Sequence, residues 1–174
     1  MDIKLTLIAG LVAAGSVGAA QAANTITFNG TVLDATCSVA LDGGTTTVEM
    51  GSVSKTDLEA NSFSAAKDFK IDLTGCPTTG EGVPTKAKIT IDGDTDTTNP
   101  DYFKNAGAAT GVAIAIYEGS SGASGKAVKS HTEGSEIDIS SGAAIVPYVV
   151  KMAKVGTVGK GGVTSTVTYN VTYY

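Results

Sequence analysis

The chain has 174 residues, and its 17 acidic residues outnumber its 12 basic residues, so it carries a net charge of −5 at pH 7. A surface with this charge is poorly disposed toward nucleic acid and anionic lipid, which excludes the usual electrostatic basis for binding either. The length suits a single folded domain once a short leader is removed.

The start of the chain is expected to be a secretory signal peptide. Lys4 supplies a positive charge, residues 5–14 are apolar, and the Ala-Gln-Ala run at 20–22 fits the small-residue rule for cleavage. An apolar run of about ten residues is too short to span a bilayer, which argues against a membrane anchor. We therefore expect residues 1–22 to be removed on export, leaving residues 23–174 without a membrane span.

The first element after the leader is a predicted strand at residues 25–32. Its residues alternate between two faces, as in a half-buried strand. One face carries Ile26, Phe28, Gly30 and Val32, and the other face is polar. The exported chain offers nothing before this strand to pair with it, so its partner is an open question.

The only two cysteines, Cys37 and Cys76, follow this strand and both lie in the exported part. An oxidising compartment favours a disulfide between them. Closing a loop of about forty residues would stabilise the fold by ~4 kcal/mol in the chain-entropy description. The alternative, a pair of reactive thiols, lacks a neighbouring histidine or basic cluster that would activate them.

Further strands are predicted along the rest of the chain, separated by turns rich in glycine, aspartate and serine. One helical turn is the most that the pattern allows, at residues 56–64, because no window keeps a 3.6-residue period. These elements indicate an all-β sandwich. The predicted strands are residues 45–50, 67–73, 86–91, 111–117, 144–154 and 163–173.

The last predicted strand, residues 163–173, has an apolar and aromatic face that includes Val167, Tyr169, Val171 and Tyr173. Its other face is almost entirely threonine. An immunoglobulin-like sandwich would normally continue into one more strand that covers this end of the core. The patterns leave two arrangements open: an incomplete sandwich that receives a strand from another molecule, or a complete one whose first strand pairs within its own chain.

Four segments, in the same order, resemble the pilins of chaperone–usher fimbriae, especially the type 1 and P pilus group. The first three are ITFNGTVLDATC, DFKIDLTGC and GVAIAIYEGSSG, which are similar to the N-terminal extension, the strand with the second cysteine and a mid-chain strand of that family. The fourth is the ending, where Gly161 stands fourteenth from the C-terminus and Tyr173 stands next to last, as in the family.

The resemblance implies an incomplete immunoglobulin-like β-sandwich that lacks its final strand. Residues 23–174 would form one pilin domain, made of an N-terminal donor-strand extension at 23–36 and the incomplete sandwich at 37–174. A periplasmic chaperone would fill the open groove with one of its own strands. At the outer-membrane usher, the extension of the next pilin subunit would replace the chaperone strand.

The resemblance also implies roles for particular residues. The side chains that this chain would donate to a neighbour are Ile26, Phe28, Gly30 and Val32. The residues expected to line or border the receiving groove and the chaperone-binding strand are Gly161, Val167, Tyr169, Val171 and Tyr173.

The expected function is that of a structural subunit of a surface fimbria, exported through the periplasm and polymerised head to tail to support adhesion. A minor adaptor or tip-proximal subunit with a binding role is an alternative from the same pathway. A self-contained secreted β-sandwich protein is the alternative outside it. The extension before Gly30 is shorter than in many major subunits, which leaves the rank of the subunit open.

Enzymatic chemistry finds little support in the sequence. The Asp-rich loop at residues 92–96 departs from the EF-hand pattern, because Thr97 and Phe103 stand where glycine and glutamate are required. His131 is the only histidine, so no Ser–His–Asp or Cys–His set is evident. Tryptophan is absent, which argues against a sugar-binding platform. We expect no catalytic residue, no cofactor and no metal site.

Overall fold

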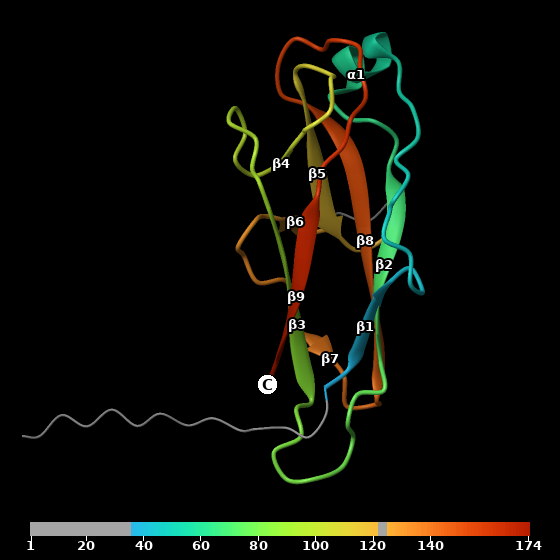
Figure 1. Ribbon diagram of the computed structural model, residues 1–174, viewed down its shortest axis with the longest axis vertical. Helices are drawn as coiled ribbons and strands as arrows, with labels where there is room; N and C mark the ends of the chain where they lie inside the picture. The colour runs from blue at the N-terminus through green and yellow to red at the C-terminus, as the bar shows by residue number, and fades with distance from the viewer. Residues whose placement is uncertain (1–35, 122–124) are drawn as a thin grey trace, which may run out of the picture. The chain divides into compact units, whose positions relative to one another are not determined.

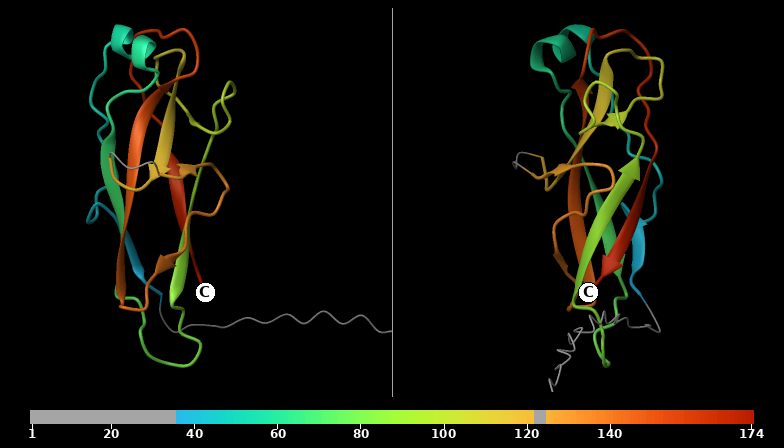
Figure 2. Two further views of the ribbon diagram at one scale, coloured as in Figure 1. Left: turned by 180° about the vertical axis from the view of Figure 1, so that it is seen from behind. Right: turned by 90° about the vertical axis from the view of Figure 1, so that its left-hand side faces the viewer.

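The computed structural model describes residues 36–121 and 125–174, which form two antiparallel β-sheets packed against each other (Figures 1 and 2). One sheet has the order β1–β2–β8–β5–β4, with β6 paired to β5, and the other has the order β7–β3–β9. The signal peptide expected at residues 1–22 and the strand expected at 25–32 lie outside the described residues. The strands are β1 (Ser38–Leu41), β2 (Lys67–Thr74), β3 (Lys86–Gly93), β4 (Phe103–Lys104), β5 (Val112–Glu118), β6 (Ala127–Val128), β7 (Ile137–Asp138), β8 (Ala143–Lys154) and β9 (Val167–Tyr173).

The core lies between the two sheets. Strands β2 and β3 contribute alternate residues, whereas residues 112–116 of β5 and 148–150 of β8 are buried consecutively. On β3, Ile89 and Ile91 are each 2% exposed, and on β2, Ile71 and Leu73 are 1% and 0% exposed. Strand β8 contributes Tyr148, which stacks on the ring of Phe69 with the ring centroids 5.3 Å apart. The prediction of an all-β sandwich is therefore confirmed.

Strand β8 is long because it pairs with two different neighbours. Its first part pairs with the whole length of β2, from Ala143 opposite Thr74 to Val150 opposite Lys67. Its second part pairs with β5, up to Lys154 opposite Val112. This strand holds the larger sheet together, and its predicted extent of 144–154 differs from the observed one by a single residue.

The one described helix, α1 (Lys55–Asn61), occupies the region where a helical turn was predicted. Ser54 caps its N-terminus: the Ser54 hydroxyl accepts a hydrogen bond from the Asp57 N–H at 3.0 Å. Leu58, which is 2% exposed, fastens the helix to a small apolar cluster with Met152 and Val158. The helix is short and owes its stability to this cap and this contact.

Ser54→Ala is expected to lower the free energy of unfolding by about 1 kcal/mol, because the first turn of α1 loses its capping acceptor. Urea unfolding of the purified chain measures the change. The control is Ser52→Ala, since Ser52 is exposed and outside the helix. Equal effects of the two substitutions would contradict a capping role for Ser54.

The prediction of a strand at residues 45–50 is wrong. The segment keeps the expected alternation, because Val48 and Met50 are half-buried while Thr47 and Glu49 are exposed. Only Thr45 takes part in a bridge, with Leu41. A strand requires a neighbour to supply its hydrogen bonds, and within the described residues this segment has none beyond that bridge.

The other differences from the predicted strands have other causes. Of the strand predicted at 163–173, only Val167–Tyr173 is extended in the sheet, because Thr164 is bonded instead to the 105–106 region: its carbonyl accepts from the Ala106 N–H and its N–H donates to Asn105 Oδ1. The strands β4, β6 and β7 have two residues each, too few to show an alternation. Strand β1 was not predicted either.

Candidate functional site

The C-terminal strand β9 has one edge without a partner among the described residues. Its other edge pairs with β3 over its whole length, from Val167 opposite Gly93 to Tyr173 opposite Ala87. The remaining terminal strands of the two sheets are short: β1 has four residues, and β4 and β7 have two each. Natural sheets keep exposed edges short because a long one invites pairing with another chain. A free edge of seven residues is therefore a site that can receive a strand.

The backbone groups that face this edge belong to the residues of the apolar row. Tyr174 and Lys86 exchange two hydrogen bonds, from the Tyr174 N–H at 2.9 Å and from the Lys86 N–H at 3.3 Å. Because bonded and non-bonded pairs alternate in an antiparallel ladder, Tyr173 and Val171 direct their N–H and C=O groups away from β3. The same alternation applies to Tyr169. We call this unpaired side of β9 the open edge.

The side chains along the open edge are less covered than their counterparts on β3. Ala87, Ile89 and Ile91 of β3 are between 0% and 2% exposed. Opposite them, Tyr173 and Val171 are only half-buried, and Tyr169 is 37% exposed. The inner row of β9 therefore packs against the core but is incompletely covered, as expected beside a missing strand.

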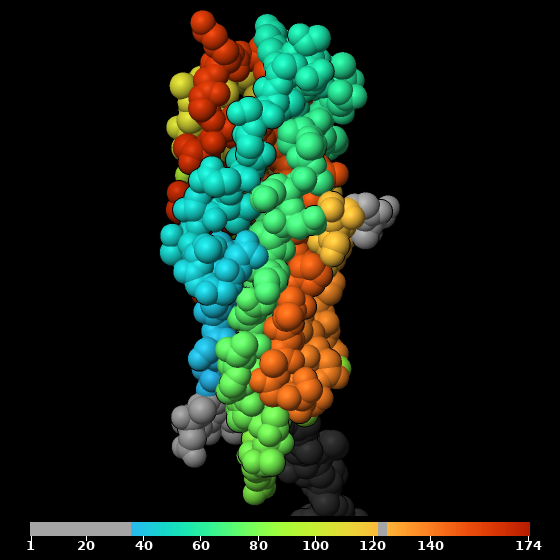
Figure 3. Space-filling model, turned by 90° about the vertical axis from the view of Figure 1, so that its right-hand side faces the viewer, coloured from blue at the N-terminus to red at the C-terminus, as the bar shows by residue number. Residues whose placement is uncertain are grey.

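A second row of apolar residues bounds the sandwich on the side of β1. Val39 and Leu41 of β1 and Val48 and Met50 of the following segment are half-buried against the same core. Figure 3 shows this part of the chain, blue to cyan, passing along β2. Residues 46–53 make no backbone hydrogen bond within the described chain. A strand placed between the two rows would find donors, acceptors and apolar surface on both sides.

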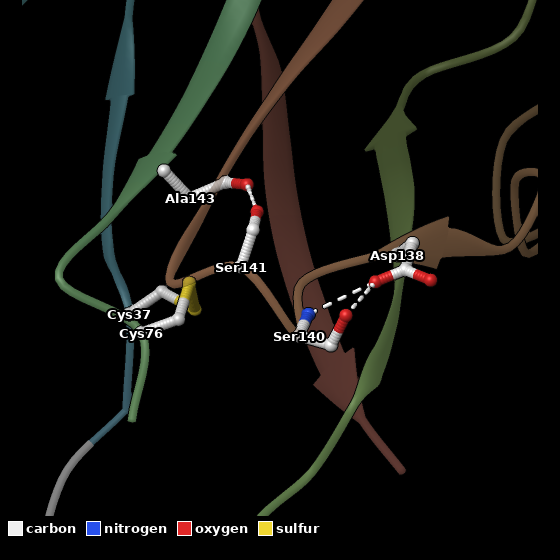
Figure 4. The surroundings of a disulfide bond; sticks show 6 residues. All are labelled: Cys37, Cys76, Asp138, Ser140, Ser141 and Ala143. Carbon is white, nitrogen blue, oxygen red and sulfur yellow. Dashed lines mark hydrogen bonds between the residues drawn. A yellow bond between two sulfur atoms is a disulfide. The ribbon is translucent and has the colours of Figure 1, made fainter. Parts of the chain in front are cut away.

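A disulfide lies beside the end of this region. Cys37, just before β1, and Cys76, just after β2, are bonded to each other and are 7% and 6% exposed (Figure 4). The two strands that they join are in register from Ser38 opposite Thr74 onward. Burial raises the pKa of the Tyr173 phenol, and a backbone group of Cys37 next to it acts in the opposite direction. The disulfide therefore holds β1 in place next to the last residue of β9.

A polar turn lies near the disulfide, where β7 leads into β8 (Figure 4). Asp138 accepts hydrogen bonds from the Ser140 hydroxyl at 2.6 Å and the Ser140 N–H at 3.0 Å, and Lys86 Nζ lies 3.2 Å away. These contacts, led by the Ser140 hydroxyl, lower the pKa of Asp138 to about 2. The charged carboxylate thus stabilises the turn.

Because folding lowers the pKa of Asp138, its contribution to stability is present above pH ~4 and is lost as the pH falls from ~4 to ~2. Asp138→Asn is expected to lower the thermal midpoint slightly at neutral pH, and the difference from the parent should close over this interval. Thermal unfolding at several pH values measures it. Glu136→Gln controls for lost surface charge, because Glu136 also lies near Lys86, at 3.6 Å. A difference that stays constant down to pH 2 would contradict the assignment.

Gly161 does not lie on the open edge but in the connection that leads into β9. A Cβ atom at Gly161 would lie 2.4 Å from the Ala109 nitrogen and 2.5 Å from the Ala108 carbonyl carbon. The neighbouring carbonyl of Gly162 accepts a hydrogen bond from the Ala109 N–H at 3.0 Å. Glycine is therefore needed here because two stretches of backbone meet.

The Asp-rich loop and His131 form an ordinary polar surface. Asp92 Oδ1 accepts from the His131 N–H at 2.6 Å and lies 3.0 Å from His131 Nδ1. Asp96 Oδ1 accepts from the N–H groups of Thr98 and Asn99, which makes a closed turn. Within residues 36–121 and 125–174, no three histidine, cysteine or acidic side chains are grouped to hold a metal.

The sequence-based selection of site residues missed the second apolar row. Val48 and Met50 were inside a predicted strand, and their alternation was the available signal, but it could not show that they pack against the same core as β9. Val39 and Leu41 gave no signal beyond two apolar residues after a cysteine. The donated residues proposed at 26, 28, 30 and 32 lie outside the described residues.

Comparison with known proteins identifies the family that has this fold. The model of the fimbrial protein family matches residues 26–174. The chain belongs to this family. The Pap fimbrial major pilin of Escherichia coli is 31% identical over 97% of this chain and 98% of its own length. The long polar fimbria protein A of Salmonella typhimurium is 30% identical over 94% of this chain and 90% of its own.

Solved structures agree with the sequence relatives. The fimbrial subunit superposes on a chaperone–usher pilus rod protein with a TM-score of 0.68 and 28% identity, over 88% of this chain and 97% of the other. It superposes on the P pilus rod subunit PapA with a TM-score of 0.67 and 25% identity, over 80% and 100%. Its fold is therefore the immunoglobulin-like fold of these pilins.

The identification as a chaperone–usher fimbrial subunit is confirmed. The protein is a structural component of a surface fimbria, it polymerises with other pilins, and its export uses the chaperone–usher system. In the described part of the fimbrial subunit, no helix has the length and apolar character needed to cross a membrane.

Proposed function

We propose that this fimbrial subunit polymerises by donor-strand exchange, in which residues 23–36 of one copy add a strand to the open edge of β9 in the next. The observation that carries the proposal is the free edge of β9: its half-buried inner row and a second apolar row pack against the same core, and no described strand pairs with this edge. Strand addition supplies main-chain hydrogen bonds for affinity and alternate side chains for register. Before assembly, a chaperone strand protects the same edge.

The donated side chains are Ile26, Phe28 and Val32. Burying each contributes roughly 1.5–3 kcal/mol, which makes on the order of 5–8 kcal/mol before ladder hydrogen bonds and ordering costs. Gly30 stands between Phe28 and Val32 on the same face. Because glycine has no side chain, it leaves room for a bulky residue of the receiving subunit. The strand has no covalent bond to its host, so repetition produces an open filament.

We propose further that the subunit forms the filament shaft and performs no catalysis. The relatives that support the shaft are named as major pilins or rod subunits, and the chain matches nearly their whole length. Labelling the chain on intact cells tests this: signal along the filament supports a shaft subunit, and signal confined to one end supports an adaptor.

The donor role is tested by deleting residues 23–31 and expressing the chain with its chaperone and usher. The truncated chain is expected to reach the periplasm and bind the chaperone, because its acceptor edge is intact, but to fail to extend filaments. Filaments of normal length from truncated subunits would refute the donor assignment.

A matched pair of substitutions separates the apolar face from the strand as a whole. Phe28→Asp is expected to abolish filament growth, because it places a charge in the receiving core. Asn29→Asp adds the same charge to the opposite face and is expected to leave growth nearly unchanged. Equal effects of the two substitutions would argue against insertion of this face.

A further inference from the structure

Strand β9 and the residue after it contain a four-residue sequence repeat, so the apolar pattern of the repeat does not distinguish two registers that differ by four residues. Residues 167–170 read Val-Thr-Tyr-Asn, and residues 171–174 read Val-Thr-Tyr-Tyr. A shift of β9 by four residues would place Val167 opposite Ile89 and Tyr169 opposite Ala87, where a valine and a tyrosine already lie. On the inner face, only Ile91 would exchange its partner for a different residue type, from Tyr169 to Ser165, so β9 itself holds little that specifies its register over this shift.

A shift of two residues is different, since it exchanges valine and tyrosine along the whole inner row. In the direction of the four-residue shift, Tyr169 would lie opposite Ile89 and Val171 opposite Ala87. In the other direction, Tyr169 would lie opposite Gly93, where Val167 Cγ1 already comes within 2.9 Å of the position of a glycine Cβ. Side-chain size alone opposes that error. The four-residue shift is the one that needs a separate device.

The position that breaks the repeat is Tyr174. Its hydroxyl donates to Glu133 Oε1 at 3.0 Å, and Lys88 Nζ lies 5.2 Å from its ring centroid. Lys88 and Glu133 are themselves paired at 2.9 Å, which joins the end of the chain to β3 and to the loop before β7. A four-residue shift would place Asn170 here, and its short side chain has no ring to lie beneath the lysine.

A second anchor lies just before the strand. The Thr164 carbonyl accepts from the Ala106 N–H at 2.8 Å, and the Thr164 N–H donates to Asn105 Oδ1 at 2.9 Å. The Gly162 carbonyl accepts from the Ala109 N–H at 3.0 Å. These bonds fix residues 161–164 against the 105–109 loop, so a shift of β9 would break them.

We propose that the register of β9 is set from outside the strand, by Tyr174 after it and by the Gly161–Thr164 segment before it. These anchors determine which residues face the open edge before any partner strand arrives. A shifted strand would move Val171 and Tyr173 beyond their places opposite Ile89 and Ala87. The proposal concerns the subunit alone and does not depend on how filaments grow.

Two cysteine pairs report the register in the purified exported chain. Thr90→Cys with Asn170→Cys reports the observed register, because these residues are opposite each other on the outer face. Thr90 and Asn170 form a hydrogen-bonded pair of the antiparallel ladder, in which the two Cα atoms are about 5.5 Å apart. This separation suits a disulfide. Thr90→Cys with Thr166→Cys reports the four-residue shift, because Thr166 otherwise lies about 13 Å away.

In the otherwise unchanged chain, only the Thr90–Asn170 pair is expected to cross-link on oxidation, as identified by mass spectrometry of the cross-linked peptides. Tyr174→Asn, which completes the repeat, combined with Asn105→Ala, which weakens the second anchor, is expected to raise cross-linking of the Thr90–Thr166 pair about tenfold. Tyr174→Phe, which keeps the ring and loses only the hydroxyl, should give an intermediate rise. No rise in the double variant would overturn the proposal.

If the double variant does not accumulate, hydrogen exchange on the single Tyr174→Asn variant decides. The Thr85 and Lys86 amides donate to the Tyr174 carbonyl at 2.9 and 3.3 Å. Their exchange should accelerate about tenfold in Tyr174→Asn and less in Tyr174→Phe. Exchange equal to that of the parent chain in both variants would overturn the proposal.

Discussion

Replacing Cys37 and Cys76 together with serine is expected to lower the free energy of unfolding by about 4 kcal/mol. The two residues are separated by 39 positions, so the disulfide removes much of the conformational freedom of the unfolded chain. It also fastens β1, which has only four residues and one strand neighbour, next to Tyr173. A loss of this size is a large fraction of the stability of a typical domain.

Urea unfolding of the purified chain, oxidised and after reduction, measures this loss. The reduced parent chain and the double serine variant should unfold at the same urea concentration, because both lack the cross-link. Ser141→Ala, a change near the disulfide that leaves the disulfide intact, is the control (Figure 4). A double variant as stable as the oxidised parent would show that the disulfide contributes nothing to folding.

Gly161→Ala is expected to lower the free energy of unfolding by about 3 kcal/mol, because the new methyl group would overlap the backbone of residues 108 and 109. The clash is with backbone rather than with a flexible side chain, so relief requires the 105–109 loop or the start of β9 to move. Since that loop holds Thr164, the substitution should also loosen the open edge.

The neighbouring glycine provides a matched control. A Cβ atom at Gly162 would meet nothing within 4 Å, so Gly162→Ala should change stability by less than about 1 kcal/mol. Urea unfolding of both variants, together with amide exchange along β9, makes the comparison. Similar losses for the two substitutions would show that the close approach at Gly161 is not what requires glycine.

The open edge has opposite consequences for a solitary subunit and for a polymer. A free edge of seven residues beside a half-covered core is a hazard for a solitary subunit, because it can pair with any available strand. The same feature is useful in a polymer, where each partner strand completes one core. Dependence on a chaperone during export is therefore a physical consequence of the fold.

Strands that are long and bury one face could be predicted from the sequence alone. Strands β2, β3 and β8 were predicted to within about two residues, because segments of this length bounded by turn residues are typical of strands. The family ending at Gly161 and Tyr173 indicated an incomplete sandwich, and the pair of cysteines in an exported chain indicated the disulfide that the structure contains.

Other features depended on the tertiary structure because their hydrogen-bond partners are distant in the chain. The alternation at Val48 and Met50 has the same form as that of a strand, but no neighbour in the described chain supplies a ladder, so the segment remains irregular. The need for glycine at 161 depends on where the 105–109 loop passes, and the contacts of Tyr174 depend on a loop forty residues earlier. Periodicity is a local property and shows which residues are buried, whereas the identity of each partner is decided only when distant segments meet.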